Sequence, residues 1–167
     1  MASEQSPKLH YKEHIRDVSK PTLVFLHGLF SSTSEFNDVC CFLTDYNLIL
    51  VDQPGHNESQ SIPFSLDNAT AGLHAILAKK DLLGKSHIIG LSLGGFVALD
   101  FARRYPGAAA SIFSTGATPF KGWQKWIAER PRVLYPLMLG LVMGMPDACY
   151  WWVCRQSGES TLLVWNV

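Results

Sequence analysis

One hexapeptide constrains the fold of this chain more than any other feature: Gly90-Leu91-Ser92-Leu93-Gly94-Gly95. It ends an apolar, strand-like run and directly precedes a helical pattern, so the serine lies at a strand-to-helix turn. Glycines on both sides allow the backbone to fold back tightly while the serine hydroxyl projects from the edge of a sheet. The backbone N–H of Leu93, at the helix start, would then point toward a negative charge forming near Ser92. On this motif alone, an ordinary glycine-rich turn with an incidental serine remains an alternative.

Short apolar runs alternate with helical patterns over the first two thirds of the chain. This alternation is typical of an α/β fold with a mostly parallel sheet flanked by helices. Three runs are continuously apolar, as expected for strands covered on both faces, and two others are weaker strand candidates. The strong strands are residues 22–27, 47–52 and 86–91, the weaker ones are 9–14 and 109–114, and the predicted helices are 34–44, capped by Thr33 or Ser34, a segment from Leu66 to near Gly84, and 94–105.

The composition changes after Pro119. Residues 121–167 are rich in tryptophan and tyrosine, are interrupted by proline, and show no clear strand pattern. We therefore divide the chain into 1–120, the N-terminal part of an α/β core, and 121–167, the beginning of a helical cap. The apolar stretch 133–145 contains Pro136 and is shorter than the ~20 residues that a membrane-spanning helix needs, so we expect no transmembrane segment. The tryptophans either line an apolar pocket or simply pack, and the sequence leaves both open.

Charge and cysteine content argue against several classes of function. Lys plus Arg and Asp plus Glu number 14 each among 167 residues, so no net charge favours nucleic acid or acidic lipid. The four cysteines form a vicinal pair and a loose pair, which is neither a zinc motif nor a dense disulfide framework. We expect reduced thiols, no metal site and no cofactor. Residues 1–20 are polar and mixed in charge, which predicts a cytoplasmic location.

Two further motifs follow the first two strong strands. His27-Gly28-Leu29 follows one strand and could supply a second backbone N–H, that of Leu29, to an oxyanion. The segment 52–59, Asp-Gln-Pro-Gly-His-Asn-Glu-Ser, follows the next strand and is turn-rich. Because the carboxyl ends of parallel strands meet at one edge of a sheet, we expect both motifs to lie beside Ser92.

With these motifs in this order, the chain resembles the α/β-hydrolase superfamily, specifically its esterase, lipase and epoxide-hydrolase-like group. The resemblance covers about residues 9–119. It implies that Ser92 is the nucleophile, that the backbones of Leu29 and Leu93 form the oxyanion hole, and that a helical cap begins near Trp123. It also implies that these residues shape the motifs: His27, Gly28, Asp52, Gly55, His56, Gly90, Gly94 and Gly95. Two departures look conservative: Asn57 stands where the family usually has glycine, and Phe36 where relatives often have tryptophan.

The chain departs from the family in its catalytic triad. In that family, the acid and the histidine follow the nucleophile, whereas all six histidines of this chain precede Ser92. His27 and His56 lie at the correct sheet edge, but their counterparts in relatives shape loops. The later carboxylates, Asp147 and Glu159, lack the context of a strand followed by an acid. We identify no triad acid or base, and we expect a C-terminally truncated member with little or no activity.

The serine motif and the missing triad members leave two classes of function open. The first is a serine hydrolase that acts through Ser92 on a small apolar ester, lactone or similar acyl substrate. The second is a non-catalytic fragment or pseudoenzyme that binds an apolar ligand or a partner protein, with self-association through uncovered apolar surface. Haloalkane dehalogenases and epoxide hydrolases are disfavoured because their turn carries an aspartate where this chain has Ser92.

Overall fold

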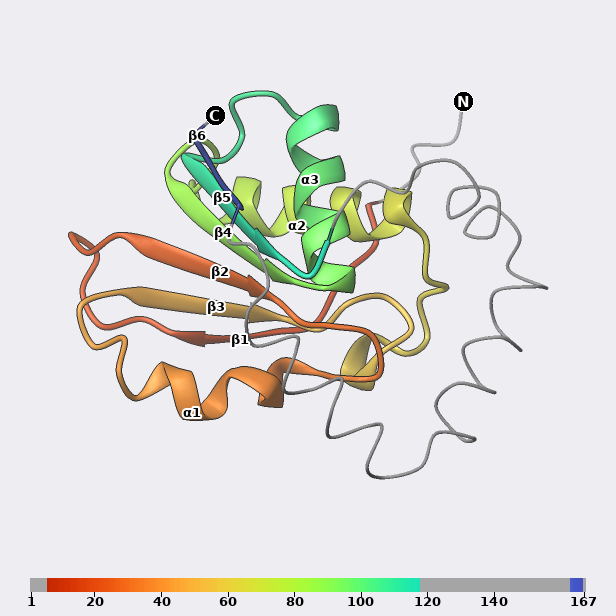
Figure 1. Ribbon diagram of the computed structural model, residues 1–167, viewed down its shortest axis with the longest axis horizontal. Helices are drawn as coiled ribbons and strands as arrows, with labels where there is room; N and C mark the ends of the chain where they lie inside the picture. Colours follow the sequence, from red (N-terminus) through yellow and green to blue (C-terminus); the bar gives the residue numbers. More distant parts are fainter. Residues whose placement is uncertain (1–5, 118–162, 167) are drawn as a thin grey trace. The chain divides into compact units, whose positions relative to one another are not determined.

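The computed structural model describes residues 6–117 and 163–166. Within these ranges the chain forms one six-stranded sheet with the order β1-β3-β2-β4-β5-β6. The four central strands are parallel, and they are β2 (Thr22–Leu26), β3 (Asn47–Val51), β4 (Ser86–Leu91) and β5 (Ser111–Thr115). The edge strands β1 (Tyr11–His14) and β6 (Leu163–Asn166) are antiparallel to their neighbours β3 and β5 (Figure 1). The predicted α/β class with a mostly parallel sheet is confirmed.

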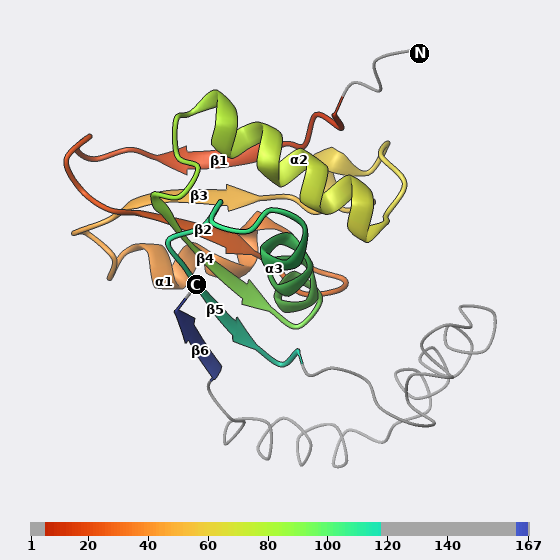
Figure 2. The same ribbon diagram turned by 90° about the horizontal axis from the view of Figure 1, so that it is seen from above.

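The helices divide between the two faces of the sheet. Helices α2 (Leu66–Lys79) and α3 (Leu93–Arg104) lie on one face, while α1 (Asn37–Cys40), preceded by the 3-10 turn η1 (Thr33–Phe36), lies on the other (Figures 1 and 2). A second 3-10 turn, η2 (Asn57–Ser59), follows β3. Since α2 and α3 connect β3 to β4 and β4 to β5, their placement follows the right-handed crossover rule for parallel strands.

Two hydrophobic clusters reflect this division, because successive side chains of a strand point to opposite faces. Val24 and Leu26 of β2 point toward α2 and α3, where they share a core with Leu73 and Phe101. The intervening residues of β2 point toward α1 and pack with Phe36, Leu48 and Leu50. Phe36 contacts Phe25 ring to ring, with centroids 4.8 Å apart, so phenylalanine fills this position as a buried aromatic anchor.

The strand β4 differs from the prediction. We expected it to be covered on both faces, but its side chains alternate between buried and half-buried, as do those of β5. Among the described residues, the buried cluster on the α1 face is formed by β2, β3 and Phe36, and Ile89 of β4 is only partly buried at its edge. His87, Ile89 and Phe113 therefore line an open groove in the described part of the chain.

Two helices also differ from the predicted ones. The segment expected as one helix over 34–44 forms η1 and then α1, which ends at Cys40, and its cap is the side chain of Ser32 rather than that of Thr33 or Ser34. Helix α2 ends at Lys79, before Gly84, because a turn with a left-handed residue, Asp81 (φ +56°), follows it. Local periodicity does not reveal these boundaries.

The predicted cap, residues 121–167, lies outside the described residues except for β6. The strand β6 was not predicted, because its four residues carry no alternation that distinguishes a strand, and its pairing with β5 is a long-range contact. The division at residue 120 and the helical character of the cap stay predictions. Among the described residues, no helix is long and apolar enough to cross a membrane.

Candidate active site

Ser92 occupies the predicted strand-to-helix turn between β4 and α3. Its backbone has φ +50° and ψ −109°, which places a non-glycine residue in the left-handed half of conformational space. Such a conformation costs about 1–3 kcal/mol and persists only where surrounding contacts enforce it. Here the Ser92 N–H donates to the carbonyl of Thr115 at 2.7 Å, and the Ser92 carbonyl accepts from Phe96 at 3.1 Å. The serine is exposed at the edge of the sheet.

The glycines around Ser92 allow close approach between backbone segments. A Cβ atom on Gly94 would lie 2.0 Å from the carbonyl oxygen of Leu26, and one on Gly90 would lie 2.4 Å from the carbonyl oxygen of Gly94. A Cβ on Gly95 would lie 2.6 Å from Ser114 Oγ. Any side chain at these positions would push α3 away from the sheet, so the tight turn depends on glycine.

The turn at His27 and Gly28 lies against the start of α3. The Gly94 N–H donates to the carbonyl of His27 at 3.1 Å, which joins the two segments directly. A Cβ built on Gly28 would be 3.8 Å from Ser92 Cβ, so the turn passes close to the serine side chain. In the described part of the chain, no group accepts a hydrogen bond from the N–H of Leu29 or of Leu93. Both amides therefore lack a described acceptor, and they belong to the two segments that meet beside Ser92.

His27 is fully buried, and its ring bridges two loops. Its Nε2 accepts a hydrogen bond from the Gln53 N–H at 3.0 Å, so in the neutral ring Nδ1 carries the proton and donates to the Gly28 carbonyl at 2.8 Å. Burial lowers the pKa of His27 below its usual value, despite the opposing hydrogen bond to Gly28. His27 is thus a neutral structural residue whose two nitrogens are both occupied.

Asp52 connects three segments beneath the site. Its buried carboxylate accepts hydrogen bonds from the N–H of Thr33 (2.9 Å), from His10 Nδ1 (2.7 Å) and from Asn57 Nδ2 (3.0 Å). Burial alone would raise the pKa of Asp52, but these three hydrogen bonds together lower it. Asn57 has φ +43°, the left-handed conformation expected where relatives carry glycine. Gly55, with φ +78°, forms the turn before it.

None of the six histidines, all of which are described, donates to or accepts from the Ser92 hydroxyl. His56 donates through Nδ1 to the carbonyl of Pro54 at 2.9 Å and packs edge-on against His27, and His87 pairs with Ser111. Asp147 and Glu159 lie outside the described residues. The described part of the chain therefore shows no acid or base paired with Ser92, and it shows no cluster of His, Cys, Asp or Glu suited to a metal ion.

Sequence analysis missed two residues of this site. Thr115 accepts from the Ser92 N–H, and its position at the end of the neighbouring parallel strand was a usable signal. Glu35 accepts from the Gly28 N–H at 2.9 Å, and nothing in the local sequence indicates this contact.

Known proteins share this arrangement of strand, turn and helix. A family model described as alpha/beta hydrolase fold matches residues 21–137. The chain belongs to the α/β-hydrolase family. Among curated α/β-hydrolase relatives, an AB hydrolase superfamily protein of Gibberella zeae is 31% identical over 67% of this chain and 40% of its own length. Lipase 1 of Psychrobacter immobilis is 30% identical over 76% of this chain and 39% of its own length.

A solved α/β-hydrolase structure, MenH from S. aureus, superposes with a TM-score of 0.63 at 33% identity, covering 74% of this chain and 48% of that one. The chain thus spans about 40% of the length of the curated relatives cited above. Membership of the α/β-hydrolase family establishes the fold and a hydrolase ancestry. The roles of individual residues and the cytoplasmic location stay predictions.

Proposed function

We propose that this chain carries the nucleophile and the oxyanion hole of a serine hydrolase that acts on small apolar esters, lactones or similar acyl compounds. The observation that carries the proposal is the strained backbone of Ser92 (φ +50°) at the junction of β4 and α3. Strain of this kind is retained where it projects a reactive side chain. The relative named Lipase 1 supports the same reaction class.

In the proposed reaction, the Ser92 hydroxyl attacks the acyl carbon, and the carbonyl oxygen becomes a negatively charged oxyanion. The N–H groups of Leu29 and Leu93 would donate to that oxygen, and the N-terminus of α3 would add its positive dipole end. The fixed orientation of the Gly28–Leu29 peptide supports the assignment of Leu29 as a donor, because the Gly28 carbonyl accepts a hydrogen bond from His27 Nδ1. Since the C=O and N–H of a trans peptide point in opposite directions, fixing this carbonyl also fixes the Leu29 N–H.

The residues flanking the site favour an apolar substrate. Leu29 and Phe30 are 50% and 76% exposed immediately after Gly28, and Phe64 is 41% exposed beside His56. Phe30 also has φ +62°, so its backbone is strained while its side chain stays in solvent. Exposed apolar side chains beside a nucleophile suit an acyl or alcohol group of the same character.

Turnover also needs a base, and we expect the isolated chain to be slow. Neither His27, with both nitrogens occupied, nor any other described histidine reaches the hydroxyl, so Ser92 keeps its ordinary weak nucleophilicity. Loss of the base in serine hydrolases removes most of the rate, and the oxyanion hole and binding retain only a small remainder.

Covalent labelling tests this proposal. Purified monodisperse chain is incubated with a fluorophosphonate probe, and the fraction of protein modified at Ser92 is followed by intact-mass spectrometry, with Ser92→Ala as the control. We expect slow labelling of Ser92 that is absent from the control, together with p-nitrophenyl acetate and butyrate turnover near background. Modification at other residues only would refute the nucleophile assignment. Fast turnover that Ser92→Ala abolishes would refute the predicted lack of a base, and His56→Ala would then test the substitute.

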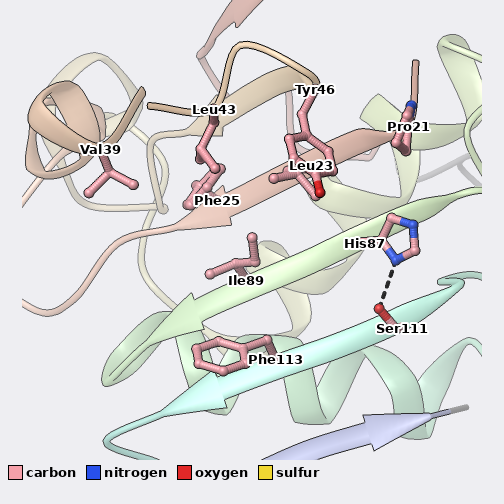
Figure 3. A pocket seen from close by; sticks show the side chains of 10 residues that line it. All are labelled: Pro21, Leu23, Phe25, Val39, Leu43, Tyr46, His87, Ile89, Ser111 and Phe113. Carbon is pink, nitrogen blue, oxygen red and sulfur yellow. Dashed lines mark hydrogen bonds between the residues drawn. The ribbon is translucent and has the colours of Figure 1, made fainter. Parts of the chain in front are cut away.

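One observation favours the alternative, a non-catalytic chain that binds an apolar ligand or partner. A groove of about 680 Å³ lies on the face of β2, β4 and β5 that α1 leaves open (Figure 3). Its floor contains an apolar row, Phe25, Ile89 and Phe113, and its polar end is the pair His87 and Ser111, joined at 2.8 Å. Gel filtration over a concentration series distinguishes the candidates, because a concentration-dependent increase in size without Ser92 labelling supports the alternative.

A further inference from the structure

The peptide unit between His27 and Gly28 is held at both ends. Its carbonyl accepts from the Gly94 N–H at 3.1 Å, and its N–H donates to Glu35 Oε2 at 2.9 Å. The next peptide unit, between Gly28 and Leu29, is held only through its carbonyl, by His27 Nδ1. Of these two consecutive N–H groups, that of Gly28 donates to Glu35, whereas that of Leu29 has no acceptor among the described residues.

Glu35 is placed for this contact by its own short turn. It belongs to η1, whose first residues are capped by Ser32, and its backbone N–H donates to the Ser32 carbonyl at 3.1 Å. The carboxylate reaches back across the turn, and its Oε2 lies 3.8 Å from the point that a Gly28 Cβ would occupy. The same point lies 3.8 Å from Ser92 Cβ. The Glu35 carboxylate and the Ser92 side chain therefore both flank the turn at Gly28.

We propose that Glu35 is a positioning residue of the active site, which orients the His27–Gly28 peptide so that the following N–H, that of Leu29, faces Ser92. The role of Leu29 as oxyanion donor rests on the proposed function. The hydrogen bond from Gly28 to the carboxylate is charge-assisted and hence stronger than one to a neutral acceptor. Because this bond occupies the Gly28 N–H, that N–H cannot compete with Leu29 for the oxyanion, and rotation of the peptide would break the bond.

A glutamine should largely replace glutamate in this role, whereas alanine should not. The side-chain amide oxygen of Glu35→Gln can still accept from Gly28, although without the charge. In Glu35→Ala, among the described contacts only the hydrogen bond from the Gly94 N–H would still hold the His27–Gly28 peptide. Removing a direct oxyanion donor costs about 10²–10³ in rate, so loss of a residue that only orients the donor should cost less, about tenfold. Glu58, an exposed glutamate in η2, provides the matched control as Glu58→Ala.

The first measurement does not depend on activity. In ¹⁵N-labelled chain, the amide shift of Gly28 is followed by two-dimensional NMR from neutral to acidic pH. We expect it to change in wild type and in Glu58→Ala, and to change much less in Glu35→Gln, where His27, which is bonded to the Gly28 carbonyl, and Asp52 still respond to pH. A Gly28 amide that does not respond in wild type, or that responds equally in Glu35→Gln, would overturn the proposal.

The second measurement is the rate of Ser92 labelling by the fluorophosphonate probe at neutral pH. We expect Glu35→Ala to slow it about tenfold, Glu35→Gln to slow it no more than about threefold, and Glu58→Ala to leave it unchanged. Equal rates in Glu35→Ala and wild type, with the Gly28 response present, would show that the contact does not serve the site and would overturn the positioning role. Absence of Ser92 labelling in wild type with the Gly28 response present would instead overturn the proposed function, together with any catalytic purpose of the contact.

Discussion

Replacement of Gly94 by alanine tests the close contact between α3 and β2 on which the site depends. The new Cβ would lie 2.0 Å from the carbonyl oxygen of Leu26, whereas real Cβ atoms essentially never approach other atoms within 3.0 Å. The obstacle is backbone, so no flexible side chain can move aside. The start of α3 would have to move by about 1 Å, which would also break the 3.1 Å hydrogen bond from Gly94 N–H to the His27 carbonyl.

Three contributions set the expected magnitude. Overpacking a well-packed contact costs about 1–3 kcal/mol, and losing one hydrogen bond costs about 0.5–1.5 kcal/mol. The higher helix propensity of alanine offsets up to about 1 kcal/mol of this loss in the free energy of unfolding. The free energy of unfolding should therefore fall by about 2 kcal/mol net.

Gly28 is the matched control, because it lies in the same site but has room. A Cβ there meets its nearest atoms at 3.8 Å, an ordinary contact, and Gly28 is not among the residues with left-handed φ. Gly28→Ala should therefore stay within about 0.5 kcal/mol of wild type. Urea unfolding followed by far-ultraviolet circular dichroism measures both variants. If Gly94→Ala unfolded at the same urea concentration as Gly28→Ala, the inferred close approach of α3 to β2 would be wrong.

Three further predictions concern stability. His27 and Asp52 both have pKa values below their ordinary values of 6.5 and 3.8. The stability that each group contributes is fully present above its ordinary pKa and is lost as the pH falls through the lower pKa of the folded state. Each group should contribute a slope of up to about 1.4 kcal/mol per pH unit, and urea unfolding that is insensitive to pH from 6.5 downward would contradict this. Asn57→Gly should cost about 0.5–1.5 kcal/mol, because the side-chain hydrogen bond to Asp52 is lost. Asn57→Ala should cost about 1 kcal/mol more than Asn57→Gly, because alanine tolerates φ +43° less well than glycine does, and equal losses in the two variants would argue against the left-handed backbone. Phe101→Ala should cost about 3–5 kcal/mol in the same assay, because this fully buried ring lies between α3 and the sheet, and a loss below 1 kcal/mol would refute its place in the core.

The sequence alone determined the order of the central elements and the place of the serine. The strands at 22–26, 47–51 and 86–91 and the turn at Ser92 were predictable because hydrophobic periodicity and glycine spacing are local properties of the chain. The left-handed backbone of Asn57 was also predictable, because conformational tolerance belongs to the residue type.

The tertiary structure alone decided what each side chain contacts. The tautomer of His27 depends on Gln53, which lies 26 residues further along the chain, and the contact of Glu35 with Gly28 depends on how η1 folds back over the turn. The half-open face of β4 and the pairing of β6 with β5 likewise depend on which elements cover or join the sheet. Such contacts join residues distant in sequence, and the packing of the whole sheet selects them, so no local pattern encodes them.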